Sequence, residues 1–528
     1  MPVRGLRPYL LALLLPLSVL MLGLNFLHVR GPYWLGTNSD PAYVYLLNSL
    51  QILAGHSPTH LDHPGVTVHA LGAIVIASQD VGTARSGPPI EEVLGDPERY
   101  LHAISRTLLV VYAVALFLAG VQVLTATGRL VLMWMVQATP FLSPSSFFEL
   151  TDVKPEPLLY AVAALLMATL CGAFLIEPKH RTTPVVLLGV LTGIGVATKF
   201  TAASLVVIPL VCLRGARERA TWAVTAAASF LFITVPAWTE WERSLSFVGR
   251  LVAGSGLYGQ RLFAHELPYI DSLQRVLVEE IVFFATQALG LIVAVVVARD
   301  RKVREMAPLR QRALTLLWAL LGTGAAQIAL VLKHPYQPRY LLPALGLTGL
   351  TMALSAWLVC WNRTGHLDAA ACAALAVFCA SVAAIEAPRF LRRHAQVRDA
   401  TACQSAAREA AEMASDCRRV SYYRGSSKPL ALYQGDAWVN HAFAERLAGL
   451  YPHESFLAAD RRLRDFKSLV EPSALSNGGC FVFQGSPGGP GRLYSRAPDA
   501  PRDSFPVGGT LTVRQSCPWE AVFEIRAR

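Results

Sequence analysis

The sequence predicts an all-α polytopic membrane protein that carries a small α+β domain at its C-terminal end. Of its 528 residues, 53% are apolar and only 16% are charged, whereas soluble domains carry roughly 25% charged residues. The apolar residues also gather in runs long enough to cross a bilayer, which takes about 20 residues. This composition indicates that lipid is the solvent for most of the chain.

The net charge of +11 does not indicate a nucleic-acid partner. The basic residues form no continuous stripe, but lie in short clusters between the apolar runs, as orientation signals of membrane proteins do. We therefore expect contacts with membrane lipids and none with nucleic acid.

Ten apolar runs are candidate spans: 8–27, 105–126, 129–148, 156–176, 184–213, 221–238, 279–298, 313–332, 341–360 and 369–387. Basic clusters mark the ends that belong inside the cell: Arg4 and Arg7, Arg129, Lys179 and Arg181, Arg214 to Arg219, and Arg299 to Arg312. The first run lacks a small-residue cleavage site, which favours a retained span over a signal peptide.

The run 184–213 does not fit a single crossing, because basic residues flank both of its ends. As one helix it would reach about 45 Å, against a hydrocarbon core of about 30 Å. Two short helices fit both length and charge, with Gly193, Gly195 and Lys199 near the outer turn. Irregular backbone at this depth requires a protein-lined or water-filled cavity, so we expect one here.

Counting this hairpin as two gives about eleven transmembrane helices, with a cytoplasmic N-terminus and residues from 389 onward outside. We expect a transmembrane domain at 1–390, whose first outer loop is 28–104, and an extracytoplasmic domain at 391–528. Within that loop, 66–78 is too short to span and is predicted to lie along the surface.

The outer domain contains four cysteines, Cys403, Cys417, Cys480 and Cys517, which predict two disulfides in an oxidising compartment. Four cysteines allow three pairings, and we favour 403–417 with 480–517. A metal site is disfavoured because no CxxC is present. Residues 393–415 read as a helix, and 480–484 and 522–525 as strands.

Polar residues collect at the predicted outer ends of the spans. They are Asp40 with Tyr43 in the first loop, His56, His60, Asp62 and His63 further along it, Asp152, Lys154 and Glu156 ahead of the fourth span, Lys199 in the hairpin, and Lys333, Arg339 and Tyr340 before the span 341–360. Charges inside a membrane cost roughly 2.5–3.5 kcal/mol each and are usually functional.

Each group also has a plainer interpretation. Lys199 could extend its side chain to the membrane surface. Asp152, Lys154 and Glu156 could form a polar turn at the interface, and a loop aspartate such as Asp40 is ordinary.

Taken together, these motifs resemble the GT-C glycosyltransferases, in particular the branch of the protein O-mannosyltransferases and aminoarabinose transferases. The resemblance covers residues 1–390 and is carried by Asp40, Leu61-Asp-His-Pro-Gly65, the acidic turn at 149–157, Ala197-Thr-Lys-Phe-Thr201 and Pro338-Arg-Tyr-Leu-Leu-Pro343. Many relatives have Asp-Glu where this chain has Ser39-Asp40, so a second acid would have to come from elsewhere, and Asp152 is our candidate.

The resemblance implies transfer of a sugar from a polyprenyl-phosphate donor to a lipid, protein or polysaccharide acceptor outside the bacterial cytoplasmic membrane. Asp40 would then accept the acceptor proton. Lys199 and Arg339, with Lys333, Arg243 and Arg261 as second choices, would stabilise the leaving phosphate. Asp152 would bind the sugar or share a metal with Asp40, and Tyr43, His63, Lys154, Glu156 and Tyr340 would contact substrate.

A cofactor is not required by this chemistry, although a divalent metal stays open. Imidazole and carboxylate suit zinc or manganese, but loop histidines such as His56, His60 and His63 are more often simply solvated.

Two other functions compete with the glycosyltransferase. A transporter or flippase would use the same intramembrane charges but predicts repeats between the two halves, and the long first loop has no counterpart in the second half. A non-catalytic envelope scaffold explains the outer domain but gives Lys199 and Asp152 no role.

Overall fold

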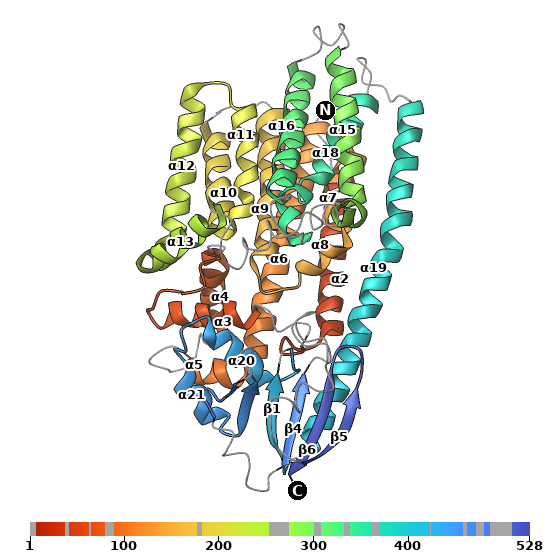
Figure 1. The fold of residues 1–528 in the computed structure, drawn as a ribbon. Coiled ribbons are helices and arrows are strands. Elements are labelled where there is room, and N and C mark those ends of the chain that lie inside the picture. The colour runs from red at the N-terminus through yellow and green to blue at the C-terminus, as the bar shows by residue number, and fades with distance from the viewer. Residues whose placement is uncertain are drawn as a thin grey trace. The chain divides into compact units, whose positions relative to one another are not determined.

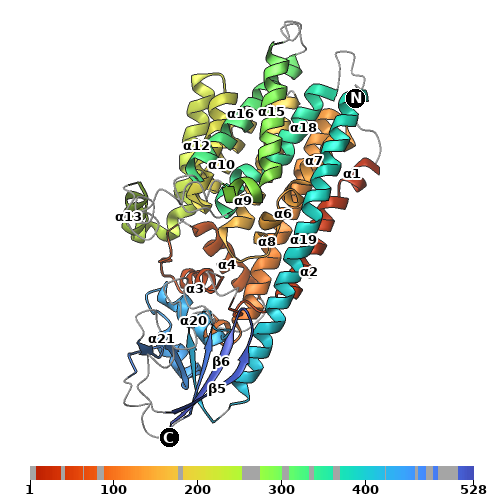
Figure 2. The same cartoon turned by 45° about the vertical axis from the view of Figure 1, so that its right-hand side comes forward.

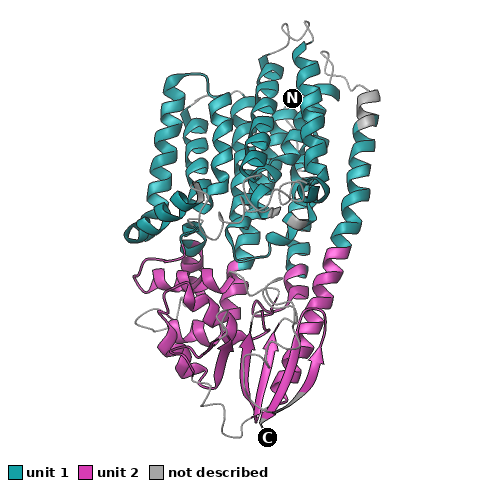
Figure 3. Cartoon of the chain, in the orientation of Figure 1, with its two compact units in different colours: residues 1–25, 61–70, 105–391 teal, residues 26–60, 71–104, 392–528 magenta. Residues whose placement is uncertain are grey.

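The computed structural model describes residues 7–36, 42–62, 65–79, 89–176, 182–252, 274–299, 308–331, 338–360, 369–414, 416–422, 424–457, 462–470, 480–485 and 509–527. Most of them are helical, and a sheet lies near the C-terminal end of the chain (Figure 1). The chain forms two compact units, shown in Figure 3. Unit 1 comprises 1–25, 61–70 and 105–391, and unit 2 comprises 26–60, 71–104 and 392–528.

Unit 1 is a bundle of apolar helices. Three helices are shared between the units: α2 (Leu14–Arg30), α4 (Val66–Gln79) and α6 (Pro97–Thr127). The others before α19 are α1 (Arg7–Leu11), α7 (Leu130–Gln137), α8 (Pro144–Glu149), α9 (Pro155–Leu170), α10 (Thr182–Thr198), α11 (Val207–Cys212), α12 (Ala216–Thr234), α13 (Trp241–Val252), α15 (Ile281–Arg299), α16 (Pro308–Val331), α17 (Leu342–Leu345) and α18 (Thr348–Cys360). The long helix α19 (Ala369–Glu412) also runs from unit 1 into unit 2.

Seven helical segments among the described residues are long and apolar enough to cross a membrane: Arg7–Arg30, Pro97–Thr127, Pro155–Leu175, Ala216–Arg250, Ile281–Arg299, Pro308–Val331 and Arg339–Cys360. Each overlaps a predicted span, so the membrane assignment agrees with the sequence. The predicted number of eleven is not reached by this criterion.

The predicted span 129–148 is wrong as a single helix. Helix α7 ends at Gln137, a 3-10 turn follows at Thr139–Phe141, and α8 begins at Pro144. Pro140 and Pro144 each lack the N–H that a continuous helix needs, so both lie at the start of a new element.

The expected break in 184–213 is confirmed. Helix α10 ends at Thr198, Lys199 is extended, and a 3-10 segment (Phe200–Val206, η3) leads into α11. In Figures 1 and 2, α10 lies beside α12. Gly193 permits this packing, since a Cβ there would lie 2.4 Å from the carbonyl oxygen of Ala226.

Unit 2 contains a six-stranded sheet in the order β3-β2-β1-β4-β6-β5. The strands are β1 (Arg418–Tyr422), β2 (Glu454–Leu457), β3 (Leu463–Arg464), β4 (Cys480–Gly485), β5 (Gly509–Ser516) and β6 (Ala521–Ala527). Strand β1 pairs in parallel with β2 and β4, whereas β6 is antiparallel to β4 and β5. The helix predicted at 393–415 and the strands at 480–484 and 522–525 are confirmed.

The sheet separates two apolar layers, because alternate residues of a strand point to opposite faces. Phe481 and Phe483 of β4 join one core cluster, while Val482 packs with Ala407 and Ala411 of α19. Three further helices belong to this unit: α5 (Ile90–Gly95), α20 (Lys428–Ala437) and α21 (Ala444–Leu450). Helix α3 (Ala42–Leu53) of the first loop packs against α20.

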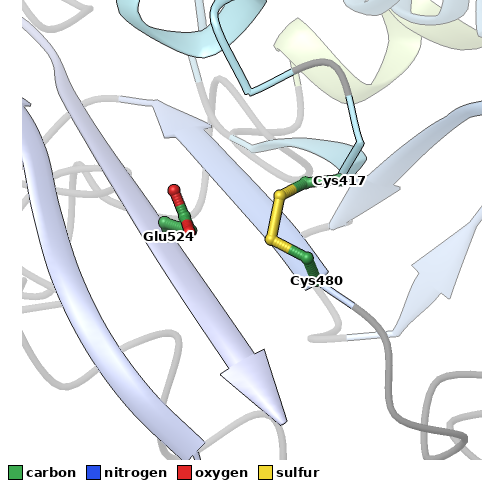
Figure 4. A group of neighbouring side chains, drawn as sticks. All are labelled: Cys417, Cys480 and Glu524. Carbon is green, nitrogen blue, oxygen red and sulfur yellow. A yellow bond between two sulfur atoms is a disulfide. The ribbon is translucent and has the colours of Figure 1, made fainter.

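Both disulfides form, but the favoured pairing is wrong. The bonds join Cys403 to Cys517 and Cys417 to Cys480. Strand order explains the result: Arg418 is paired with Phe481 in the parallel β1–β4 ladder, so the preceding residues of both strands are neighbours. Figure 4 shows this second bond beside Glu524. Its two sulfurs are bonded to each other and are therefore not thiolate ligands for a metal.

Candidate functional site

The acidic turn ahead of α9 places three charged side chains close together in unit 1. Ser143 caps α8 through a bond from the N–H of Ser146, and Pro155 opens α9, so the turn 150–154 is held between two helix ends. Lys154 Nζ lies 2.6 Å from Asp152 Oδ2 and 3.5 Å from Glu149 Oε2. One ammonium group therefore bridges two carboxylates of the turn.

Lys199 forms a second, deeper ion pair. Its Nζ lies 2.5 Å from Glu156 Oε1, and the side chains are only 2% and 1% exposed. Lys199 interrupts the apolar run because it is the extended residue between α10 and η3, while Glu156 lies in the first turn of α9. The interpretation of Lys199 as a side chain reaching the surface does not hold, because its ammonium is buried against an acid.

Arg339 and Tyr340 close the cluster from the segment that precedes α17. The Lys199 ammonium lies 5.3 Å from the centre of the Tyr340 ring, and the Arg339 guanidinium lies 5.8 Å from the same ring. Gln327 of α16 donates a 2.5 Å hydrogen bond to the Tyr340 carbonyl and contacts Ser204 through its own side-chain oxygen. Lys199 and Arg339 thus lie near the Tyr340 ring, while Gln327 holds the Tyr340 backbone.

The site has balanced formal charge: the carboxylates are Glu149, Asp152 and Glu156, and the cations are Lys154, Lys199 and Arg339. Burial raises the pKa of Glu149, with Lys154 opposing the rise and the neighbouring acids adding to it. Burial alone lowers the pKa of Lys154, but the nearby carboxylates together raise it above its ordinary value. Lys154 therefore stays cationic at neutral pH.

The first outer loop contributes a separate arrangement in unit 2, made by residues that precede and follow 37–41 in the sequence. Glu98 accepts a 2.6 Å bond from the Tyr43 hydroxyl and a 2.8 Å bond from the N–H of Tyr33. The N–H of Gly36 donates to Ser426 Oγ at 3.1 Å. The described residues before and after 37–41 in the sequence are therefore held by hydrogen bonds.

Ser426 belongs to a network inside the C-terminal sheet. Glu520 is fully buried and accepts bonds from the N–H of Ser426 at 2.6 Å and from Gln484 Nε2 at 2.8 Å, while the Ser426 hydroxyl also donates to it. Burial raises the pKa of Glu520, and these hydrogen bonds oppose the rise. Gly36 is required here, since a Cβ would lie 2.0 Å from the Arg424 carbonyl oxygen.

The histidines of the first loop do not form a metal cluster among the described residues, where the sole candidate is the Cys417–Cys480–Glu524 group. His60 is buried between Tyr45 and Trp438, with ring centres 5.3 and 4.9 Å away. Burial lowers its pKa to about 4, so the imidazole is neutral at physiological pH. His60 therefore acts as a packing residue.

Of the predicted site residues, Asp152, Lys154, Glu156, Lys199, Arg339 and Tyr340 come together, whereas Tyr43 lies in unit 2. Asp40, His63 and Lys333 lie outside the described residues. Sequence reasoning missed Glu98, Gln327 and Glu520 as positioning residues. Glu98 carried a weak signal, being an acid in the first turn of a long apolar helix, and the other two carried none.

No protein-family model matches the chain, and no curated protein matches it. Among solved structures, ArnT from Cupriavidus metallidurans bound to undecaprenyl phosphate is 13% identical, with a TM-score of 0.49 over 98% of this chain and 97% of that one. The same protein in the apo state is 16% identical, with a TM-score of 0.46 over 91% and 95%. At these values the function has to be argued from the residues of this chain.

Proposed function

We propose that the protein is a membrane glycosyltransferase that moves a sugar from a polyprenyl-phosphate donor to an acceptor outside the cytoplasmic membrane. The observation that supports it best is the buried Lys199–Glu156 pair beside Arg339 and Tyr340, among apolar helices. Charged groups in such surroundings are costly and mark substrate or ion sites. A donor with an apolar tail and an anionic head group suits a site where the cations Lys199 and Arg339 lie among apolar helices.

The reaction needs a base and a stabilised leaving group. The acceptor hydroxyl or amine attacks the anomeric carbon, the new bond forms as the bond from that carbon to the phosphate oxygen breaks, and polyprenyl phosphate leaves with the electron pair. Asp40 takes the acceptor proton. The phosphate needs no proton, but it does need positive charge.

Lys199 and Arg339 supply that charge, and Lys333 is a further candidate from the segment before Arg339. Glu156 keeps Lys199 cationic and holds it in place, because the ion pair offsets the cost of burying the ammonium. An ammonium has three donors, so a phosphate oxygen can bond Lys199 while Glu156 remains bound. Fixed cations that meet developing charge are often the largest single contribution to catalysis.

The neighbouring residues bind the sugar. Asp152 is held by Lys154 at 2.6 Å, so its carboxylate is fixed within the charged cluster and can accept hydrogen bonds from sugar hydroxyls. Tyr340 offers an aromatic face, and sugars stack on such faces through their C–H groups. Tyr43 supports the segment that carries Asp40 through its bond to Glu98.

A donor panel tests this function. Purified protein is incubated with radiolabelled polyprenyl-phosphate sugars and, separately, with nucleotide sugars, and free polyprenyl phosphate is measured. We expect turnover of a polyprenyl-phosphate sugar only, strongly reduced in Lys199→Gln and unchanged in Lys467→Gln, an exposed lysine of unit 2. Turnover of nucleotide sugars, or a fully active Lys199→Gln protein, would rule the proposal out.

A further inference from the structure

An apolar groove of about 620 Å³ runs between α2, α7, α18 and α19 in unit 1. Its wall includes Leu22, Trp134, Met352, Val382 and Phe390, and it contains one charged residue, Glu386 of α19. Residues of α7, α18 and α19, three helices labelled in Figure 2, line it together. The rim is open, since Leu22, Val131 and Leu391 are 40%, 52% and 69% exposed. In a membrane this rim faces lipid, so an acyl chain fits the groove.

Glu386 is buried at the groove wall with an incomplete set of partners. The residue is 4% exposed, and its Oε1 lies 3.2 Å from Arg389 NH1. Its Oε2 is buried and has no hydrogen-bond partner. A buried polar atom without a partner costs about 1–3 kcal/mol, and more when charged, so a ligand that donates a hydrogen bond to Oε2 would be favoured.

A second buried carboxyl lies nearby. Glu280, which precedes α15, is 1% exposed and interacts electrostatically with Glu386. The groups around the two acids are the Ser143 side chain, Glu279 and Arg389. Arg389 is also engaged with the carbonyls of Val278 at 2.8 Å and Glu279 at 3.3 Å. Two buried carboxyls therefore lie near one guanidinium, and Oε2 of Glu386 still has no hydrogen-bond donor.

The order of charges along α19 indicates the head group. Glu386 faces the groove and Arg389, one turn further on, is a third exposed. An acid next to an arginine complements a zwitterion with an ammonium next to a phosphate. Glu386 also lies at the end of the predicted span 369–387, at the depth where head groups begin. A polyprenyl phosphate does not fit here, because it brings only negative charge to two carboxyls.

We propose that this groove binds a phospholipid whose zwitterionic head group carries a primary ammonium, with the ammonium on Glu386, the phosphate on Arg389 and one acyl chain along α2 and α7. The lining of the groove includes none of the residues of the proposed donor site. It holds whether or not the transferase proposal is correct.

The test compares lipids that differ only in the head group. The purified full chain in detergent is titrated with dioleoyl phosphatidylethanolamine, phosphatidylcholine and phosphatidylglycerol, and bound lipid is counted by native mass spectrometry. Phosphatidylcholine has the same charges but no N–H donor. We expect phosphatidylethanolamine to bind about tenfold more tightly than either, the size of one charge-assisted hydrogen bond.

Two variants locate the site. Glu386→Gln should bring phosphatidylethanolamine down to the level of phosphatidylcholine, and Glu409→Gln, which changes an exposed acid of the same helix, should leave the preference intact. If Glu386→Gln does not fold, Glu280→Gln is measured instead and should weaken the preference for phosphatidylethanolamine. Equal binding of the three lipids by wild type, or an undiminished preference in Glu386→Gln, would overturn the proposal. Since the readout is bound lipid, an inactive transferase would not affect it.

Discussion

Lys199 and Glu156 depend on each other at the residue scale. Removing one partner of a buried ion pair leaves a charge without compensation and typically costs 3–5 kcal/mol. We expect Glu156→Leu to lower the free energy of unfolding by about that amount, and Lys199→Met/Glu156→Leu to recover most of it. Thermal unfolding in detergent measures both.

The same variants should show that activity and stability do not recover together. The double variant should remain inactive although it is stable, because its apolar pair cannot bind the leaving phosphate. An active double variant would show that the pair has only a structural role.

The Tyr43 hydroxyl belongs to a second residue-scale prediction. Tyr43→Phe removes the 2.6 Å donor to Glu98, and losing a bond to a carboxylate costs about 1.5–3 kcal/mol. We expect a lower melting temperature and lower turnover, since Asp40 lies only three residues earlier in the chain. Tyr451→Phe is the matched control, because that hydroxyl makes a 3.4 Å bond to a carbonyl. Equal melting temperatures for the two variants would contradict the proposed support by Glu98.

Glu520 gives a prediction for pH. Burial raises its folded-state pKa above the unfolded value, so the folded protein binds a proton more tightly than the unfolded chain. The contribution of this group to stability is therefore largest below the unfolded pKa and falls as pH rises through the folded pKa. Each unit between the two values is worth about 1.4 kcal/mol.

As pH rises from 4 to 7, the melting temperature of wild type should thus fall relative to that of Glu520→Gln. Glu524→Gln is a control with the opposite sign, because hydrogen bonds from Arg526 lower the pKa of Glu524. A pH-independent difference for Glu520→Gln would contradict the assignment.

At the scale of elements, the two disulfides cross-link a helix and strands of unit 2. Peptide mapping without reduction should recover the linkages Cys403–Cys517 and Cys417–Cys480, which close separations of 114 and 63 residues. Loops of this size predict that each bond stabilises the fold by roughly 4 kcal/mol in the chain-entropy account. Recovery of a Cys403–Cys417 peptide would contradict the β1–β4 register.

The sequence could predict those elements that its own local signals determine. Basic residues at both ends of 184–213 and the two glycines near Lys199 predicted the break that the structure has. Pro140 and Pro144 indicate the break in 129–148. The apolar run is nevertheless long enough for one span, and this length led to the wrong prediction of a single helix. The disulfide pairing could not be predicted from local signals. It depends on the parallel pairing of β1 with β4, which is a property of the sheet topology.

The partners in the site were equally beyond sequence reasoning. Lys199, Arg339 and the turn before α9 were identified as unusual polar groups, and the structure brings them together. Which acid pairs with which cation depends on how α9 packs against α10, and no spacing encodes this packing. The supports given by Gln327 and Glu98 were missed for the same reason.

At the scale of the whole molecule, the residues that we propose for the chemistry belong to both compact units. Unit 1 contains the cations Lys199 and Arg339. In unit 2, hydrogen bonds through Gly36, Ser426 and Glu520 join the first outer loop to the C-terminal sheet. A role for residues 391–528 follows: this region fixes the chain on one side of Asp40. Loss of the region should therefore abolish turnover even if unit 1 still folds.

The central claim is that this chain transfers a sugar from a polyprenyl-phosphate donor with Asp40 as the base. The most direct measurement is single-turnover sugar release from a radiolabelled polyprenyl-phosphate sugar by wild type and Asp40→Asn protein of equal melting temperature. We expect release by wild type and a loss of at least about a hundredfold in the variant, the usual contribution of a general base. Undiminished release by Asp40→Asn, or none by folded wild type with any such donor, would contradict it.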